Sequence, residues 1–230
     1  MAFVGVLWLV TGVEWATKSD FGFLGILPRR IEGAIGIFTG PLIHGSASHL
    51  FSNTLPLVIL GIGLFYIYDR IAFEVFAWIY VSSGFWVWLS AREAYHIGSS
   101  GLVYGMVTFL FMVGLLRRDP KSIAVAMIVF LLYGGMIYGL IPGNGDVSWE
   151  SHLFGALSGV FCAFYYHRYK TRNRVTKVVA ALGPHVEPPL SRHNHTLPGG
   201  LEMRYVYRKS EEKEKDRRKP SDGPEESGIK

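Results

Sequence analysis

The chain has little cysteine and little charge. Cys162 is the one cysteine among 230 residues, and it lies inside an apolar stretch. A disulfide within the chain is therefore excluded, and so is a zinc site built on CxxC pairs. Charged residues make up 18% of the sequence, and they gather in short connections and in the tail after Tyr166. Such segregation of charge is not typical of a soluble globular domain.

Apolar residues, by contrast, are abundant. Half of the residues are hydrophobic, and the mean hydropathy is +0.26. This composition indicates a membrane protein. The net charge of +5 could suggest nucleic acid as a partner, but the basic residues stand beside apolar segments, where they would orient the protein in a membrane instead. The N-terminus lacks a basic leader and a small-residue cleavage site, so we expect a first membrane span there rather than a removed signal peptide.

Six apolar runs are each long enough, or nearly so, for one crossing of about 20 residues. They are Ala2 to Ala16, His49 to Tyr68, Ile71 to Ser90, Ser100 to Leu116, Ser122 to Ile141 and Trp149 to His167. Each must be helical because lipid offers no partner for backbone amides. The sequence thus predicts an all-α membrane protein with a six-helix core over residues 1–167. Residues 168–230 should form a charged cytoplasmic tail, largely disordered.

The basic residues between the spans predict the orientation. Most of them fall on one side: Arg70, Arg117, Arg118, Lys121, Arg168, Lys170, Arg172, Arg174 and Lys177. That side should be cytoplasmic, which places both termini in the cytosol and the protein in the cell membrane. The connection 17–48 then lies outside. Its many apolar side chains predict that it dips into the outer membrane face.

Polar side chains that fall within or beside spans are candidates for function. His49 and Asn53 are four residues apart, on one face of the second span, and His44 precedes them. The side chains of His49 and Asn53 can donate hydrogen bonds to a developing oxyanion. Polar contacts between helices and a metal site built from the two histidines are the alternatives. Because the cluster has no carboxylate and catalytic metal sites prefer three protein ligands, we expect no metal.

A serine flanked by glycines opens the fourth span, in Gly98-Ser99-Ser100-Gly101. Ser100 could be a helix cap or a nucleophile. The glycines favour a nucleophile, since they let backbone amides and an incoming peptide come close. The pattern differs from the GxSxG of soluble hydrolases because Leu102 follows Gly101. Tyr104 lies one helical turn after Ser100 on the same face.

The sixth span carries His152 above two small residues, Gly155 and Gly159, on one helix face. The fourth span has Gly101 and Gly105 at the same spacing, so a close contact of the two helices could bring the histidine to the serine. An imidazole beside a serine is the minimum for an activated nucleophile. The alternative is a buried histidine bonded to a backbone carbonyl.

Two other titratable residues bear on this pair. Glu150 precedes His152 by two residues and should point to a different face, so we expect a Ser-His dyad rather than a triad. His96 is a competing base because it is close to Ser100 in sequence. We favour His152, since a loop position should be less rigid and wetter.

In this order, the motifs resemble those of the rhomboid intramembrane serine proteases over residues 1–167. The family motif HxxxxHxxxN matches His44, His49 and Asn53. The motif GxSG, with a tyrosine four residues after its serine, matches Gly98, Ser99, Ser100, Gly101 and Tyr104. The motif AHxxGxxxG matches His152, Gly155 and Gly159. Ser151 stands in place of the alanine of the last motif. Pro28-Arg29 occupies the region where many members carry a Trp-Arg pair.

The resemblance implies roles for these residues. Ser100 would be the nucleophile and His152 the general base, with the imidazole packed against Tyr104. His49, Asn53 and the backbone N–H of Ser100 would form the oxyanion hole. Gly98 and Ser99 would shape the approach of the substrate.

The implied function is hydrolysis of single-pass membrane proteins near their outer end, without a cofactor, by an enzyme surrounded by lipid. An inactive relative that binds transmembrane helices as an adaptor is the alternative. Such a relative would be expected to lack the serine or the histidine. A transporter or channel would need polar residues through the whole membrane depth, whereas here they crowd one side. The sequence leaves the substrate and the oligomeric state open.

Overall fold

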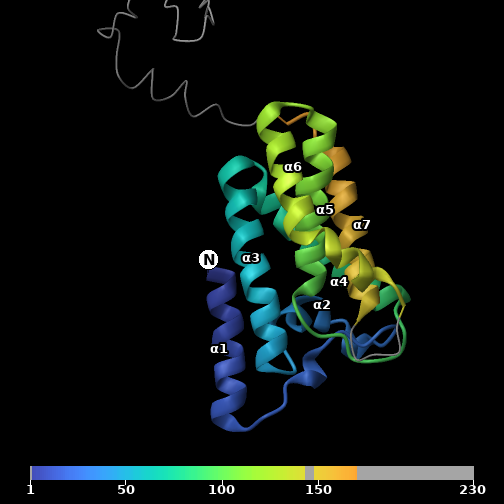
Figure 1. Ribbon diagram of the computed structural model, residues 1–230. Coiled ribbons are helices and arrows are strands. Elements are labelled where there is room, and N and C mark those ends of the chain that lie inside the picture. The colour runs from blue at the N-terminus through green and yellow to red at the C-terminus, as the bar shows by residue number, and fades with distance from the viewer. Residues whose placement is uncertain (1, 143–147, 170–230) are drawn as a thin grey trace, which may run out of the picture. The chain divides into compact units, whose positions relative to one another are not determined.

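The computed structural model describes residues 2–142 and 148–169 (Figure 1). Seven α-helices lie in this part: α1 (Ala2–Thr17), α2 (Gly36–Thr39), α3 (Ala47–Ile67), α4 (Ala72–Ser90), α5 (Ser100–Arg117), α6 (Pro120–Tyr133) and α7 (Trp149–Tyr166). Four 3-10 segments accompany them: Gly22–Leu24, Ile31–Gly33, Gly40–Leu42 and Gly134–Leu140. The expected all-helical class is confirmed for the described residues. The predicted tail lies outside them, apart from residues 168 and 169.

Four helical stretches are long and apolar enough to cross a membrane: α3, α4, α5 and the run Pro120–Leu140 formed by α6 and its 3-10 extension. They support an integral membrane protein. The 16-residue α1 and the more polar α7 are not among them. The count of six crossings and the sidedness of the termini therefore stay predictions.

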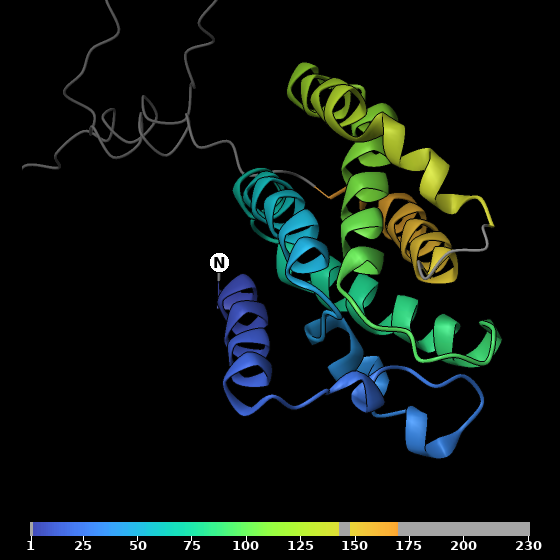
Figure 2. The ribbon, with the colours of Figure 1, turned by 60° about the horizontal axis from the view of Figure 1, so that its bottom comes forward.

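Helix α5 is the central element. It contacts α3, α4, α6 and α7, and in Figure 2 it runs between α3 on one side and α7 on the other. Its apolar side chains fill the core together with those of α3 and α4. The fully buried members include Leu50, Leu60, Leu64, Val75, Ile79, Met106, Phe109 and Leu110.

Glycines let α5 and α7 touch through their backbones. A Cβ added at Gly155 would lie 2.7 Å from the carbonyl carbon and 2.9 Å from the Cα of Gly101. One added at Gly159 would collide with the carbonyl oxygen of Gly105. Thr108 adds a hydrogen bond from its hydroxyl to α7. The helix contact expected from the glycine spacing is thus present, and it is closer than any side chain would allow.

The connection between α1 and α3, which is predicted to lie outside and is called the outer connection, is folded over residues 18–46 into short helical turns. Its backbone pairs with the α4–α5 loop through an isolated bridge between Ile26 and His96. It exposes Phe23, Ile31, Ile35 and Phe38. These apolar side chains are in keeping with contact with the outer membrane face, which stays a prediction.

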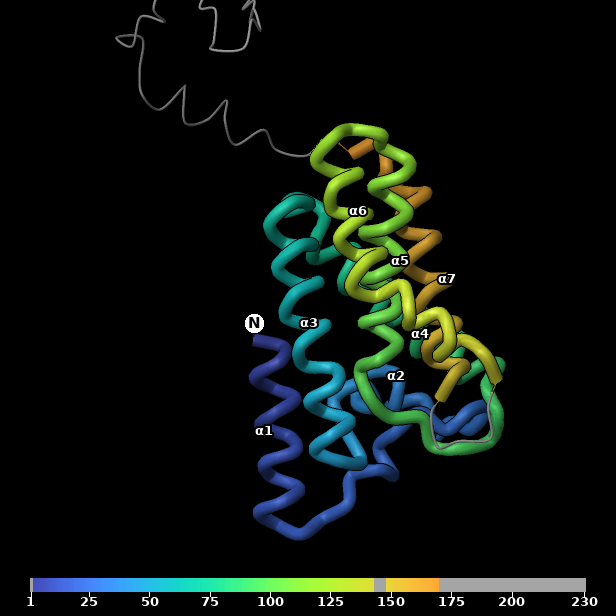
Figure 3. The backbone as a smooth tube through the Cα atoms, viewed as in Figure 1, coloured from blue at the N-terminus to red at the C-terminus, as the bar shows by residue number. Residues whose placement is uncertain are grey.

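The fifth predicted span differs from a plain α-helix. Asp119 caps its start by accepting a hydrogen bond from the backbone N–H of Ser122 at 3.1 Å. The α-helix then ends at Tyr133, and the chain continues as a 3-10 helix from Gly134 to Leu140. Figure 3 shows α6 passing alongside α5 and this extension continuing towards the start of α7. Two consecutive glycines, which weaken an α-helix, lie at the change.

The glycine contact yields a test of stability. Gly155→Ala should lower the free energy of unfolding by about 1–3 kcal/mol, because the methyl group would press on the backbone of Gly101. Gly61→Ala in α3 is the matched control, since nothing lies within 4 Å of its added Cβ. Thermal unfolding in detergent micelles measures both. Equal stability of the two variants would contradict the contact.

Candidate active site

The first residue of α5 meets the first turn of α7. Ser100 Oγ lies 3.0 Å from His152 Nε2, although the two residues are 52 positions apart. His152 is only 7% exposed and Ser100 is half-buried. The close approach of the two helix backbones produces this pairing, since it brings their N-terminal ends together.

The other ring nitrogen of His152 fixes its tautomer. Nδ1 lies 2.9 Å from the carbonyl oxygen of Gly139. A carbonyl oxygen can only accept, so Nδ1 carries the proton and donates it. In the neutral ring Nε2 is then the acceptor and faces the hydroxyl of Ser100. The imidazole is thereby oriented to take a proton from the serine.

Tyr104 holds the plane of the imidazole. Its ring stacks on that of His152 with centroids 4.2 Å apart and an angle of 9°. Its hydroxyl donates to the carbonyl oxygen of Met136 at 2.8 Å. The 3-10 segment therefore supplies two backbone acceptors, one to Tyr104 and one to His152. These two bonds and the ring stacking together restrict lateral movement of the imidazole.

Gly139 was missed by sequence reasoning. It acts through a backbone carbonyl, which no residue type encodes. Its lack of a side chain is nevertheless required, because an added Cβ would collide with the Tyr104 hydroxyl and lie 3.2 Å from His152 Nδ1. The glycines spaced through the 3-10 segment were the available signal for a close approach of its backbone.

Gly98 forms the turn before the serine. Its φ of +100° belongs to a region that side chains disfavour. An added Cβ would also lie 2.6 Å from Cε1 and 2.8 Å from Nε2 of His49. The His49 imidazole therefore covers the turn that leads into Ser100. Asn53 is buried one turn further along α3, and its side-chain amide donates to the His49 carbonyl oxygen at 3.1 Å.

His44 supports the residue next to the serine. The backbone N–H of Ser99 points to His44 Nε2 at 3.4 Å, and the Ser99 hydroxyl lies 3.2 Å from the same nitrogen. Nε2 is therefore unprotonated. Burial lowers the pKa of His44 to about 4, and the neighbouring His49 lowers it too, whereas the Leu42 backbone acts weakly in the opposite direction. In its neutral form His44 can accept the hydrogen bond that the Ser99 N–H donates.

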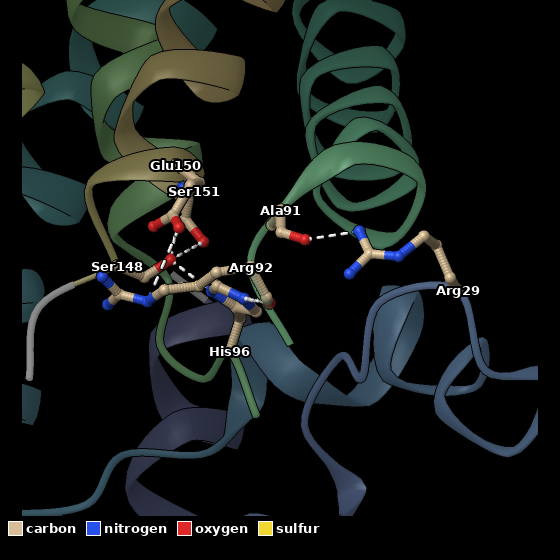
Figure 4. A network of polar contacts seen from close by, with 7 residues as sticks. All are labelled: Arg29, Ala91, Arg92, His96, Ser148, Glu150 and Ser151. Atoms are coloured by element: carbon tan, nitrogen blue, oxygen red, sulfur yellow. Dashed lines mark hydrogen bonds and ion pairs between the residues drawn. The ribbon is translucent and has the colours of Figure 1, made fainter. Parts of the chain in front are cut away.

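His96 lies in the loop before Gly98, as expected, but it is buried. It is 3% exposed, and its ring bonds to Ser148 and to the backbone of Arg92. The expectation of a wet, loose loop position was wrong, because the outer connection and α7 cover the loop on both sides. Glu150 lies on a different face from His152, as expected, and there it meets Arg92 at 3.5 Å. Figure 4 shows this polar network.

The chemical groups of the site limit the reactions that it can carry out. Within residues 2–142 and 148–169, no three histidine, cysteine or acidic side chains come together as they would around a metal ion. The assembled groups are one hydroxyl, one oriented imidazole and several hydrogen-bond donors. They suit acyl transfer to the serine.

The low pKa of His44 predicts a pH-dependent stability. Between pH 6.5 and about 4 the unfolded chain binds a proton at His44 that the folded protein does not. His44 alone should therefore lower the free energy of unfolding by about 2 kcal/mol as the pH falls from about 7.5 to 5. Thermal unfolding at the two pH values should show a smaller loss for His44→Gln. The same loss in both proteins would exclude His44 as the source.

The chain matches known sequences. The model of the Rhomboid domain matches residues 32–169, which is more than half of the chain. Uncharacterized proteins of Mycobacterium bovis and Mycobacterium tuberculosis are each 32% identical to it over 198 residues, covering 80% of this chain and 81% of theirs. An uncharacterized protein of Mycobacterium leprae is 32% identical over 196 residues, covering 81% and 78%. No solved structure matches significantly. With the matched region spanning both Ser100 and His152, the chain belongs to the rhomboid family.

Proposed function

We propose that the protein is an intramembrane serine endopeptidase that cuts single-pass transmembrane proteins near their outer end. The observation that carries this proposal is the contact of Ser100 Oγ with His152 Nε2 at 3.0 Å, with Nδ1 held by the Gly139 carbonyl. This is the arrangement that a general base needs to activate a serine. The backbone carbonyl takes the orienting role of a triad's carboxylate.

The reaction would run in two acyl-transfer steps. His152 Nε2 takes the hydroxyl proton as Ser100 Oγ attacks the scissile carbonyl carbon. The imidazolium then gives the proton to the leaving amine, and an acyl group stays on the serine. Water, deprotonated by the same nitrogen, attacks the ester, and the imidazolium returns the proton to Ser100 Oγ as the acid is released.

The oxyanion formed in each step needs hydrogen-bond donors. The backbone N–H of Ser100 is one, since it belongs to the first turn of α5 and has no partner within its helix. His49, whose ring covers Gly98, and Asn53 are the proposed side-chain donors. Donors fixed in a region of low dielectric constant stabilise a developing charge strongly.

The depth of Ser100 in the membrane determines which peptide bonds can reach it. Helix α5 has 18 residues, or roughly 27 Å, against a hydrocarbon core of about 30 Å. Ser100 should therefore lie a little below the outer membrane surface. A substrate helix must unwind before its peptide bond can reach Oγ, because helical backbone groups are bonded to each other. Glycine and other helix-weakening residues near the cut should favour cleavage.

We also propose the partners and the location of the protein. Lipid and transmembrane substrates are the proposed partners, no cofactor is required, and the cell membrane with cytoplasmic termini is the proposed location. An inactive adaptor would need neither an oriented imidazole nor a serine hydroxyl beside it.

Substitution of the two reacting side chains tests the proposed activity. Purified protein should react with a fluorophosphonate probe and cleave a single-pass substrate, whereas Ser100→Ala and His152→Ala should lose both activities by about 10³-fold or more. Ser90→Ala, at the exposed end of α4, is the control and should retain them. Cleavage that persists in either site variant would overturn the assignment. A folded native protein that neither labels nor cleaves would favour the adaptor.

Substitution of Gly139 tests the orientation of the imidazole. Gly139→Ala should slow probe labelling about 10- to 100-fold, because the methyl group displaces Tyr104 and His152. Gly135→Ala is the matched control in the same 3-10 segment, since nothing lies within 4 Å of its added Cβ. Labelling rates of purified proteins at equal concentration decide the matter. Indistinguishable rates for the two variants would count against the Gly139 contact.

A further inference from the structure

The loop 91–99 joins α4 to α5 and ends at the proposed nucleophile. Its backbone is fixed by the outer connection. Ile26 and His96 exchange two N–H···O bonds, each of 2.9 Å. The N–H of Gly98 donates to the Gly40 carbonyl oxygen, also at 2.9 Å. These bonds hold the loop on its outer side and leave the side chain of His96 facing α7.

The His96 side chain reaches the start of α7 (Figure 4). Nε2 lies 3.0 Å from the carbonyl oxygen of Arg92, so this nitrogen carries a proton and donates it. Nδ1 lies 2.6 Å from the hydroxyl of Ser148. In the neutral ring Nδ1 accepts the proton of that hydroxyl. Burial lowers the pKa of His96, although the Arg92 carbonyl and the Glu150 charge oppose the shift, and so the neutral ring is favoured.

Ser148 transmits the contact into the helix. It is the N-cap of α7, and its hydroxyl oxygen accepts from the backbone N–H of Ser151 at 3.3 Å. The Ser151 hydroxyl lies 2.7 Å from the same oxygen. The backbone carbonyl oxygen of Ser151 in turn lies 3.0 Å from the position of an added Cβ on Gly101. The cap therefore bonds to Ser151, the residue of α7 whose backbone contacts Gly101 of α5.

A second link joins the same loop to the same helix end. Arg92 Nε lies 3.5 Å from Glu150 Oε1, and the Glu150 side chain is only 5% exposed. A buried carboxylate needs a compensating charge, and Arg92 provides it. The two links together connect the loop with the first turn of α7 through side chains.

The positions of the linked residues suggest their purpose. His96 stands four residues before Ser100, and Ser148 stands four residues before His152. Glycine surfaces fix how close two helices come, but offer few side chains to fix their axial register. We propose that His96, acting through Ser148, is a positioning residue that sets the register of α7 against α5 and hence the contact between Ser100 and His152. This proposal rests on the proposed function.

Paired substitutions at His96 separate the bridge from simple packing. Asn can place an oxygen near the position of Nδ1 and still accept from Ser148, whereas Gln places its amide near Nε2 and loses that bond. Towards a single-pass substrate, His96→Gln and Ser148→Ala should lower kcat about 10- to 100-fold with KM within about twofold. His96→Asn should stay within about threefold of the native kcat. Tyr95→Ala, half exposed in the same loop, is the control.

The double variant and hydrogen exchange complete the test. His96→Gln combined with Ser148→Ala should be no slower than either alone, because both remove one interaction. Amide exchange in the peptide 96–102 should be about tenfold faster in His96→Gln than in His96→Asn. Equal kcat and equal exchange for the Asn and Gln variants, or additive losses in the double variant, would overturn the proposal. If the native protein cleaves nothing, the proposed function fails, and the exchange rates alone decide whether His96 holds the loop.

Discussion

The backbone contact between α5 and α7 is the constraint on which the site depends. Gly155 lies so close to the backbone of Gly101 that it could not carry a side chain without moving a helix, and a side chain at Gly101 would press on the Ser151 carbonyl oxygen. That approach brings Ser100 and His152 within hydrogen-bond distance at the helix ends. The polar pair is therefore a consequence of helix packing in the apolar interior. In a membrane, small residues drive helices together through close packing, whereas in water hydrophobic burial does so.

Backbone groups carry much of the polar organisation. Gly139 orients His152, Met136 orients Tyr104, and the amide of Ser99 is held by a neutral His44. Carbonyl and amide groups orient the reacting side chains without adding buried charge, which is costly at membrane depth. The buried Glu150 is placed away from the pair and is matched by Arg92.

The sequence predicted the helical class, the glycine contact and the meeting of Ser100 with His152. Spacing along a helix specifies these, since residues four or seven apart share a face. It could not predict the 3-10 segment, because an apolar run specifies burial in lipid and not the type of helix. Nor could it reveal Gly139, which acts through its carbonyl, or the burial of His96, which depends on two segments distant in sequence.

The tautomer of His152 tests the account most directly, because the proposed attack of Ser100 requires an unprotonated Nε2 that faces its hydroxyl. Nitrogen-15 NMR of histidine-labelled protein, with His152→Gln used to assign the signal, distinguishes the two ring nitrogens at neutral pH. The account predicts a protonated Nδ1 and an unprotonated Nε2 whose signal shifts in Ser100→Ala. A protonated Nε2 in the neutral ring, unaffected by loss of the serine hydroxyl, would contradict it.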